Sequence, residues 1–291
     1  MSPAPGRCWV CDSDALTLVK PSDLDTMRPE DFAISDAHYG RTAAIYRCAG
    51  CGFLECADLR EVVQYYEALE DTAYVDSRPE RLLQARRLLR AVERLSGRSL
   101  AGTRLLDVGA GSGPLVEEAL AYGVRAEGIE PSRWLQAHAR RLGLPVHHGV
   151  LPHAAVTGEF DVVALIDVIE HTPDPRGLLQ QALALLAPGG VLVVVTPDVS
   201  SLAAKAMGWR WWHFRLAHVG YFSTATLEAL TARLGLVTVA QARPGWVLPL
   251  PYLVERLERY LPFRLPRLSA LATMAVPFNL RDSILLVARR G

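Results

Sequence analysis

The sequence predicts an α/β fold in which helices cover both faces of a mostly parallel sheet. From residue 104 onward, short apolar segments suited to strands alternate with longer amphipathic segments suited to helices. This alternation is typical of parallel sheets, which bury both faces and bind ligands at the carboxyl ends of their strands. We expect strands at residues 104–108, 126–130, 146–148, 160–168 and 191–196, with two last strands at 237–240 and 283–288 closing the sheet.

Helices are predicted between these strands from apolar spacing and from residues that favour helix ends. Apolar residues recur at helical spacing between residues 82 and 95, with arginines between them. Gly97 is expected to end this helix, while Ser223 and Gly235 are expected to bound the last one before the closing strands. The other helices are expected to begin at Pro114, Ser132 and Pro175.

Composition excludes several classes of protein. The 291 residues are 50% hydrophobic, which suffices for a sizeable core, and 31 basic residues balance 31 acidic ones. A net charge of zero provides no basic field, so general nucleic-acid binding is not expected. No apolar run reaches the roughly 18 residues that span a bilayer, and a cysteine pair stands where a signal peptide would be apolar. We therefore expect a cytoplasmic protein whose five cysteines are reduced thiols or metal ligands.

Four cysteines form two pairs with the spacing of a metal site. Cys8 and Cys11 are separated by two residues, as are Cys48 and Cys51. This spacing lets both sulfurs of a pair face one ion, and two pairs complete a closed tetrahedral site for structural zinc. Unligated thiols and a redox-active pair are the alternatives. Cys56 is expected to be a buried apolar residue and not a ligand.

A glycine-rich segment follows the first predicted strand of the sheet. Gly109, Gly111 and Gly113 alternate with other residues, which lets the backbone approach a ligand closely, and Pro114 suits the first turn of a helix. The segment matches neither the dinucleotide spacing G-x-G-x-x-G nor a P-loop. Glu130, at the end of the next strand, occupies the place of acids that bind ribose hydroxyls in nucleotide-binding folds.

Taken in chain order, these motifs resemble those of class I S-adenosylmethionine (SAM) dependent methyltransferases. The resemblance rests on Asp107-x-Gly109-x-Gly111-x-Gly113, Glu130, Asp167-Val-Ile-Glu170-His171 and Leu186-Ala-Pro-Gly-Gly190. It implies a Rossmann-like sheet whose last strand is antiparallel, and SAM as cofactor. By that likeness the three glycines pass under the methionine portion, Glu130 holds the ribose, and Asp107 and Asp167 join the cofactor-binding residues.

The cysteine pairs, followed by Tyr65 and Tyr66, resemble those of a bacterial subgroup that carries a zinc ribbon and is met in glycan and natural-product pathways. Asp12 stands where that subgroup usually has glycine after the first pair. The resemblance covers nearly the whole chain apart from residues 243–281. We expect a zinc ribbon at residues 1–60, a helical segment at 61–100, and a methyltransferase domain at 101–291 with an insertion at 244–281.

Methyl transfer requires alignment of the acceptor with the methyl group, and a hydroxyl acceptor must also lose its proton. Glu170 and His171 lie just past the fourth strand, and His218 lies on a segment expected to return over the same pocket, so these three are the catalytic candidates. The pattern also resembles metal-assisted O-methyltransferases of ubiquinone biosynthesis and of small-RNA 2′-OH methylation, which begin it with Glu where this chain has Asp167. We favour His171 as a general base, with a magnesium site and a purely structural histidine as alternatives.

Two further segments bear on the acceptor. Residues 211–214 are Trp-Trp-His-Phe. We expect so many aromatic side chains either to line an acceptor pocket or to pack in the core, and we favour the pocket, which would then include His213. The insertion contains an amphipathic helix at residues 252–261, with Arg256 and Arg259 expected on its wetter side. It would form a lid, a dimer contact or a membrane-surface element through residues 245–280.

These observations predict SAM-dependent O-methylation of a hydroxyl on a glycan or natural-product intermediate, with a small molecule or glycan as acceptor. C- or N-methylation of a small metabolite is the second enzymatic hypothesis. A non-catalytic SAM-binding scaffold is the hypothesis from a different class.

Overall fold

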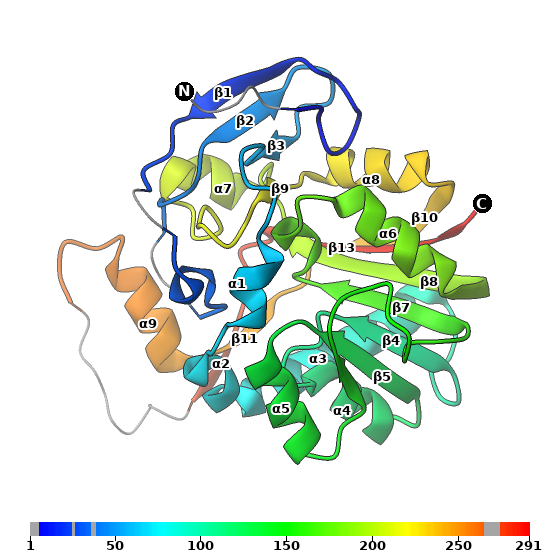
Figure 1. Cartoon of the computed structure of the whole chain (residues 1–291). Coiled ribbons are helices and arrows are strands. Elements are labelled where there is room, and N and C mark those ends of the chain that lie inside the picture. Colours follow the sequence, from blue (N-terminus) through cyan, green and yellow to red (C-terminus); the bar gives the residue numbers. More distant parts are fainter. Residues whose placement is uncertain (1–5, 25–26, 36–38, 265–273) are drawn as a thin grey trace.

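The computed structural model describes the chain except for residues 1–5, 25–26, 36–38 and 265–273 (Figure 1). Its central sheet has seven strands in the order β10-β13-β8-β7-β4-β5-β6. These strands are β4 (Arg104–Val108), β5 (Arg125–Glu130), β6 (Val146–His148), β7 (Phe160–Ile166), β8 (Leu186–Pro197), β10 (Leu236–Ala242) and β13 (Ser283–Arg290). Strands from β8 to β6 pair in parallel, whereas β13 is antiparallel to both β8 and β10. The predicted Rossmann-like sheet with an antiparallel last strand is confirmed.

Helices cover both faces of this sheet because successive strand residues point to opposite sides. Val162 belongs to the apolar layer beneath α3 and α4, whereas its neighbour Val163 belongs to the layer beneath α6 and α8. The helices are α3 (Arg78–Ser96), α4 (Pro114–Ala121), α5 (Arg133–Arg141), α6 (Pro175–Ala184) and α8 (Thr224–Arg233). Ser132 and Ser223 cap α5 and α8 through their side chains, as expected from the sequence.

A second, antiparallel sheet lies beside the first (Figure 1). Its order is β1-β2-β3-β9, with strands β1 (Leu16–Lys20), β2 (Ile45–Cys48), β3 (Leu54–Glu55) and β9 (Gly220–Tyr221). The fourth strand therefore comes from the second half of the chain. The short helical segments near this sheet and on the way to α3 are η1 (Pro29–Phe32), α1 (Val63–Glu67) and α2 (Thr72–Asp76).

The predicted insertion contains β11 (Trp246–Pro249), α9 (Leu250–Glu258) and β12 (Ala275–Phe278), and its residues 265–273 lie outside the described part of the chain. β11 and β12 pair as a separate two-stranded sheet. The prediction that Arg256 faces water is wrong. Arg256 is buried because its guanidinium lies over the rings of Tyr252 and Tyr39, at 4.0 and 5.0 Å from their centroids.

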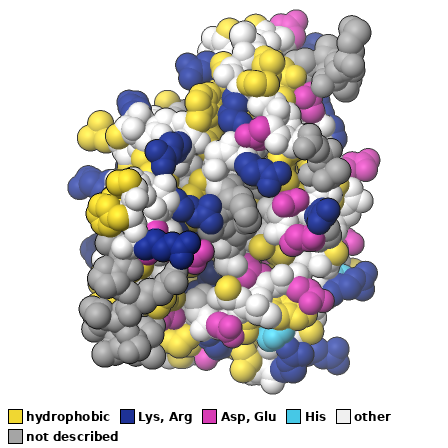
Figure 2. Space-filling model, turned by 90° about the vertical axis from the view of Figure 1, so that its left-hand side faces the viewer, with side chains coloured by type: hydrophobic (Ala, Val, Ile, Leu, Met, Phe, Trp, Pro, Cys, Tyr) yellow, Lys and Arg dark blue, Asp and Glu magenta, His cyan; other side chains and the backbone are white. Residues whose placement is uncertain are grey.

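The face of the molecule that carries α9 mixes side chains of all kinds. Figure 2 shows basic, acidic and apolar side chains interspersed on this face. Within the described residues, no helix is both long and apolar enough to cross a bilayer. Neither observation tests peripheral contact with a membrane through residues 245–280, which stays a prediction.

Candidate cofactor and acceptor site

A cavity of about 870 Å³ opens at the carboxyl ends of β4, β5 and β7. This volume lies within the range that is typical of ligand pockets. Among the residues predicted for the site, the cavity is lined by Asp107, Gly109, Gly111, Glu130, Asp167, Glu170, His171, His213 and His218. Residues separated by more than a hundred positions in the sequence are thus brought to one place, as the topology of a parallel sheet requires.

Gly113 is the predicted site residue that this cavity does not include. Its φ of 85° is left-handed, and a Cβ at this position would lie 2.7 Å from the Cδ1 of Leu144. Close packing between the start of α4 and the segment before β6 therefore accounts for this glycine. Contact between Gly113 and the cofactor stays a prediction, and Gly113 directly precedes α4.

Glu130 and the glycine loop are joined by hydrogen bonds. The backbone N–H groups of Gly111 and Ser132 donate to the two carboxylate oxygens of Glu130, at 2.8 and 2.7 Å. Burial raises the pKa of Glu130 to about 7, and burial next to Glu130 raises the pKa of Asp107 to about 7. Two carboxyl groups at the ends of adjacent strands can therefore act as hydrogen-bond donors or acceptors near neutral pH.

Tyr74 lies directly over the glycine loop. Gly111 has a φ of 55°, and a Cβ added to it would overlap the Tyr74 hydroxyl. The guanidinium of Arg81 lies 3.5 Å from the centroid of the Tyr74 ring, and both side chains line the cavity. Neither residue could be identified from the sequence, because the pattern of α2 and α3 does not show which of their side chains reach a distant sheet.

Hydrogen bonds fix the tautomer of His171. Its Nδ1 lies 2.8 Å from the carbonyl oxygen of Ala217 and 2.7 Å from the hydroxyl oxygen of Tyr66, which itself donates to Ala217 at 2.8 Å. A carbonyl oxygen can only accept, so Nδ1 carries the proton and Nε2 holds the lone pair. Burial lowers the pKa of His171 to about 4, and the ring is therefore neutral near pH 7.

Three imidazole rings form a continuous cluster beside this position. His171 and His218 meet edge to face with ring centroids 4.7 Å apart, and His218 stacks on His213 at 5.6 Å. Burial lowers the pKa of His213 and of His218 well below the usual value, so all three rings are neutral. Neutral imidazoles can accept a proton or bind a metal ion.

Among the described residues, two buried atoms in or beside this cluster have no hydrogen-bond partner. They are Oε1 of Glu170 and Nδ1 of His218, while Oε2 of Glu170 accepts from Thr196 at 2.9 Å. Ligand atoms of Glu170, His171 and His218 all lie within 4.8 Å of one another. This donor set fits a divalent ion, and two imidazoles with one carboxylate suit a transition metal better than magnesium.

The aromatic segment at residues 211–214 is divided between core and cavity. Trp211 is fully buried, whereas Trp212 and His213 line the cavity. Both tryptophan Nε1–H groups donate to Oδ2 of Asp282, at 3.0 and 2.9 Å. Asp282 therefore holds this segment in place. No motif in the sequence indicates this role, because Asp282 lies far along the chain from both tryptophans.

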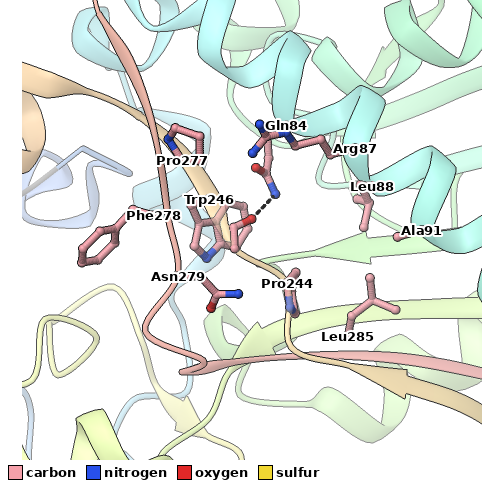
Figure 3. A pocket seen from close by; sticks show the side chains of 11 residues that line it. Gln84, Arg87, Leu88, Ala91, Pro244, Trp246, Pro277, Phe278, Asn279 and Leu285 are labelled. Atoms are coloured by element: carbon pink, nitrogen blue, oxygen red, sulfur yellow. Dashed lines mark hydrogen bonds between the residues drawn. The ribbon is translucent and has the colours of Figure 1, made fainter.

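A smaller cavity of about 340 Å³ lies between α3 and the insertion (Figure 3). Its wall is mostly apolar and contains none of the residues predicted for the site. The Gln84 side chain donates to the carbonyl oxygen of Gly245 at 2.9 Å and accepts from the backbone N–H of Val247 at 3.1 Å. Gln84 thus anchors the insertion on α3, so that β11 and α9 form one wall of the larger cavity.

The four paired cysteines converge at one point away from the cavity. The Sγ atoms of Cys8 and Cys51 are 3.6 Å apart, those of Cys11 and Cys48 are 3.5 Å apart, and all four lie within 4.8 Å of one another. A tetrahedral zinc ion with bonds of about 2.3 Å holds its sulfur atoms about 3.8 Å apart. The arrangement therefore fits such an ion. Cys56 is buried outside this cluster, in agreement with the sequence analysis.

Asp12 lies in the first cysteine turn, directly after Cys11. Its φ is 65°, a left-handed conformation that aspartate tolerates better than most residues. The Asp12 carboxylate pairs with Arg176 at 2.7 Å and with Arg233 at 3.2 Å. The Asp12 carboxylate therefore links the turn to α6 and α8.

Comparison with known proteins places the fold in a family. A family model described as "Methyltransferase domain" matches residues 80–241, more than half of the chain. Magnesium protoporphyrin IX methyltransferase from Synechocystis PCC 6803, solved with bound SAH, aligns with a TM-score of 0.50 and 14% identity over 78% of this chain and 91% of that one. The chain therefore belongs to the methyltransferase-domain family and has the class I SAM-dependent methyltransferase fold.

Curated relatives match part of the chain. The ubiquinone biosynthesis O-methyltransferase of Haemophilus ducreyi is 38% identical over 109 residues, which are 33% of this chain and 46% of that protein. The protein of the same name from Methylobacterium sp. is 32% identical over 158 residues, 48% of this chain and 63% of that protein. The chain spans about half the length of the curated relatives it matches.

Proposed function

We propose that the protein transfers a methyl group from SAM to a hydroxyl group of a small-molecule acceptor. The observation that carries this proposal is that one cavity is lined by the glycine loop, Glu130 and His171 together. The relatives named O-methyltransferases support oxygen as the acceptor atom. Following the label of [methyl-³H]SAM into hydroxylated acceptors tests the activity.

In this proposal the cofactor lies along the carboxyl ends of the strands. Gly109 and Gly111 pass under its methionine portion, and Glu130 accepts hydrogen bonds from the ribose hydroxyls. Each Glu130 oxygen already accepts one backbone N–H and has a second lone pair for this purpose. Asp107 and Asp167 complete the set, and burial raises the pKa of Asp167 to about 7. A sulfonium beside these carboxyl groups favours their charged form.

The proposed reaction is an in-line displacement. The acceptor oxygen forms a bond to the methyl carbon as the carbon–sulfur bond breaks, and the electron pair of that bond remains on the sulfur of S-adenosylhomocysteine. Nε2 of His171 accepts the hydroxyl proton, since the Ala217 carbonyl keeps the ring in the required tautomer. Tyr66 supports the same orientation through its hydroxyl.

A metal-assisted version of the same reaction is favoured by one observation, the two unpartnered atoms of Glu170 and His218 beside His171. An ion held there would acidify the acceptor hydroxyl. The donor set argues against magnesium as that ion. We retain His171 as the base because Asp167 stands where the metal-assisted families have Glu.

We further propose that the acceptor is a glycan or natural-product intermediate and that the insertion serves as a lid over it. The support is that Trp212, Leu248, Tyr252 and Phe278 line the same cavity as the histidine cluster. Aromatic and apolar side chains of this kind bind the flat or apolar faces of small molecules. The cavity is also enclosed on one side by the insertion, which Gln84 ties to α3.

The four cysteines are proposed to hold a structural zinc ion. We expect about one zinc per chain to survive dialysis of the reduced protein, since a closed thiolate site releases its ion slowly. Cys8→Ser and Cys48→Ser should each lose this zinc and expose the N-terminal residues to protease. Elemental analysis measures the metal. A second equivalent of metal that persists in Cys48→Ser would support the ion at Glu170, and absence of zinc from the wild-type protein would refute the cysteine site.

A further inference from the structure

The antiparallel sheet β1-β2-β3-β9 and the four paired cysteines together are called the cysteine module here. The segment that carries His218 continues directly into this sheet. Two residues after His218, β9 begins, and it pairs with β3 through Leu54 opposite Tyr221 and Glu55 opposite Gly220. The backbone N–H of Cys56 donates to Val219 at 2.7 Å. A catalytic candidate is therefore attached to the N-terminal sheet through main-chain hydrogen bonds.

The same series of hydrogen bonds reaches Glu170. The backbone N–H of Val219 donates to the carbonyl oxygen of Glu170 at 2.8 Å. Glu170 belongs to η2 (Ile169–His171), the short helical turn that also contains His171. Main-chain bonds thus run without interruption from β3 through residue 219 to the turn that holds two of the three catalytic candidates.

The cysteine cluster fixes the strand from which this series starts. β2 ends at Cys48, the backbone N–H of Cys48 bonds to Phe53 at 2.9 Å, and β3 begins at the next residue, Leu54. Cys51 lies in the turn between these strands. An ion bound to both cysteines would therefore set the position of β3 relative to β2.

Packing couples the two regions as well. The Phe53 ring is fully buried and lies 4.7 Å from the ring of Phe222, centroid to centroid. A Cβ added to Gly220 would lie 3.1 Å from the Cζ of Phe53. Cys8 and Phe53 belong to the same apolar cluster as Leu106 of the central sheet. The cysteine module therefore shares its core with the methyltransferase domain.

We infer that the cysteine module is a positioning element of the cavity. Metal bound by its four cysteines holds β3, and through it the backbone of residues 217–221 and of the turn at Glu170. This inference rests on the proposed zinc site and on the proposed role of the histidine cluster. The module thus acts on residues that contact the acceptor, without itself contacting the cofactor.

Amide hydrogen exchange followed by mass spectrometry tests this inference without any turnover assay. Cys48→Ala removes a buried ligand, and Cys56→Ser is the matched control because it replaces a buried cysteine outside the cluster while keeping a side-chain donor for the carbonyl oxygen of His218. In Cys48→Ala we expect peptides covering residues 45–56, 169–171 and 217–221 to exchange about tenfold faster or more, because local opening raises exchange only in the segments that open. Exchange in β4 and β5 and the affinity for SAM should stay near wild type. Cys56→Ser should keep its zinc and the wild-type exchange pattern.

Two outcomes would overturn the inference. If residues 45–56 open while 217–221 keep their protection, the module is independent of the site. If β4 and β5 open equally, the metal stabilises the whole protein and has no specific effect on residues 217–221. If the wild-type protein does not bind SAM, the proposed function is refuted instead. The two failures can therefore be told apart.

A second variant perturbs the junction while leaving the cysteines intact. Gly220→Val places a branched side chain against the Phe53 ring, so we expect faster exchange in residues 217–221 with the zinc retained. This variant also covers the case in which Cys48→Ala fails to fold. Unchanged exchange at 217–221 in Gly220→Val would contradict the proposed coupling.

Discussion

Replacement of His171 by alanine should lower turnover by roughly 10²- to 10⁴-fold, the range that is usual for loss of an acid–base group, while the affinity for SAM stays near wild type. Burial lowers the pKa of the wild-type ring to about 4, so the free enzyme carries the unprotonated base throughout the neutral range. At saturating SAM, protonation of His171 should therefore leave wild-type turnover nearly constant around pH 7 and lower it only as the pH approaches about 4. The residual rate of His171→Ala should instead rise with pH, because the acceptor must then ionise unaided.

The matched control is His153→Ala, which removes a histidine outside the cavity. It should retain wild-type turnover. Steady-state kinetics across the neutral range, together with calorimetry for SAM, separates the chemical step from cofactor binding. Full activity of His171→Ala would remove this residue from the mechanism and direct attention to His213 and His218.

Replacement of Gly111 by valine should abolish SAM binding. The residue has a φ of 55°, and a Cβ there would collide with the Tyr74 hydroxyl, which lies over the loop. A branched side chain would strain the backbone and push Tyr74 and the loop apart, which disturbs the place proposed for the methionine portion. Displacement of the Gly111 N–H would further release Glu130 from one of its two backbone donors. Calorimetry with SAM measures the loss.

Gly143→Val provides a control for backbone strain. Gly143 has a φ of 73°, yet a Cβ there would meet no atom within 4 Å. This variant carries a similar left-handed penalty without blocking the cavity, so it should bind SAM like the wild type. Equal loss of SAM binding in both variants would mean that Gly111→Val acts through folding and would defeat the proposed placement of the cofactor.

The central sheet and one side of the site could be predicted from sequence because they depend on local patterns. Apolar strands alternate with helices, and the glycine loop lies directly between β4 and α4. Glu130 is the last residue of β5, and the turn at His171 comes soon after β7. Their place at the carboxyl edge of the sheet therefore follows from the topology. The order of these motifs along the chain was enough to bring them into one cavity.

Contacts between distant segments could not be predicted from the same patterns. The hydrogen bond of Tyr66 to His171 joins residues on separate elements, and no periodicity of a short helix indicates such a partner. Arg256 was assigned to the solvent side from its charge, but two tyrosine rings cover it. The pairing of β9 with β3 likewise escapes prediction, since a strand of two residues carries no pattern of its own.

The proposed activity is tested most directly by following the label of [methyl-³H]SAM into glycan and small-molecule acceptors with free hydroxyl groups, beside the same acceptors with those hydroxyls acetylated. We predict that label enters only the free-hydroxyl forms and that S-adenosylhomocysteine accumulates in equal amount. Label entering the acetylated acceptors equally well would contradict O-methylation and indicate transfer to carbon or nitrogen. Failure to label any acceptor by a protein that binds SAM would contradict the enzymatic proposal itself.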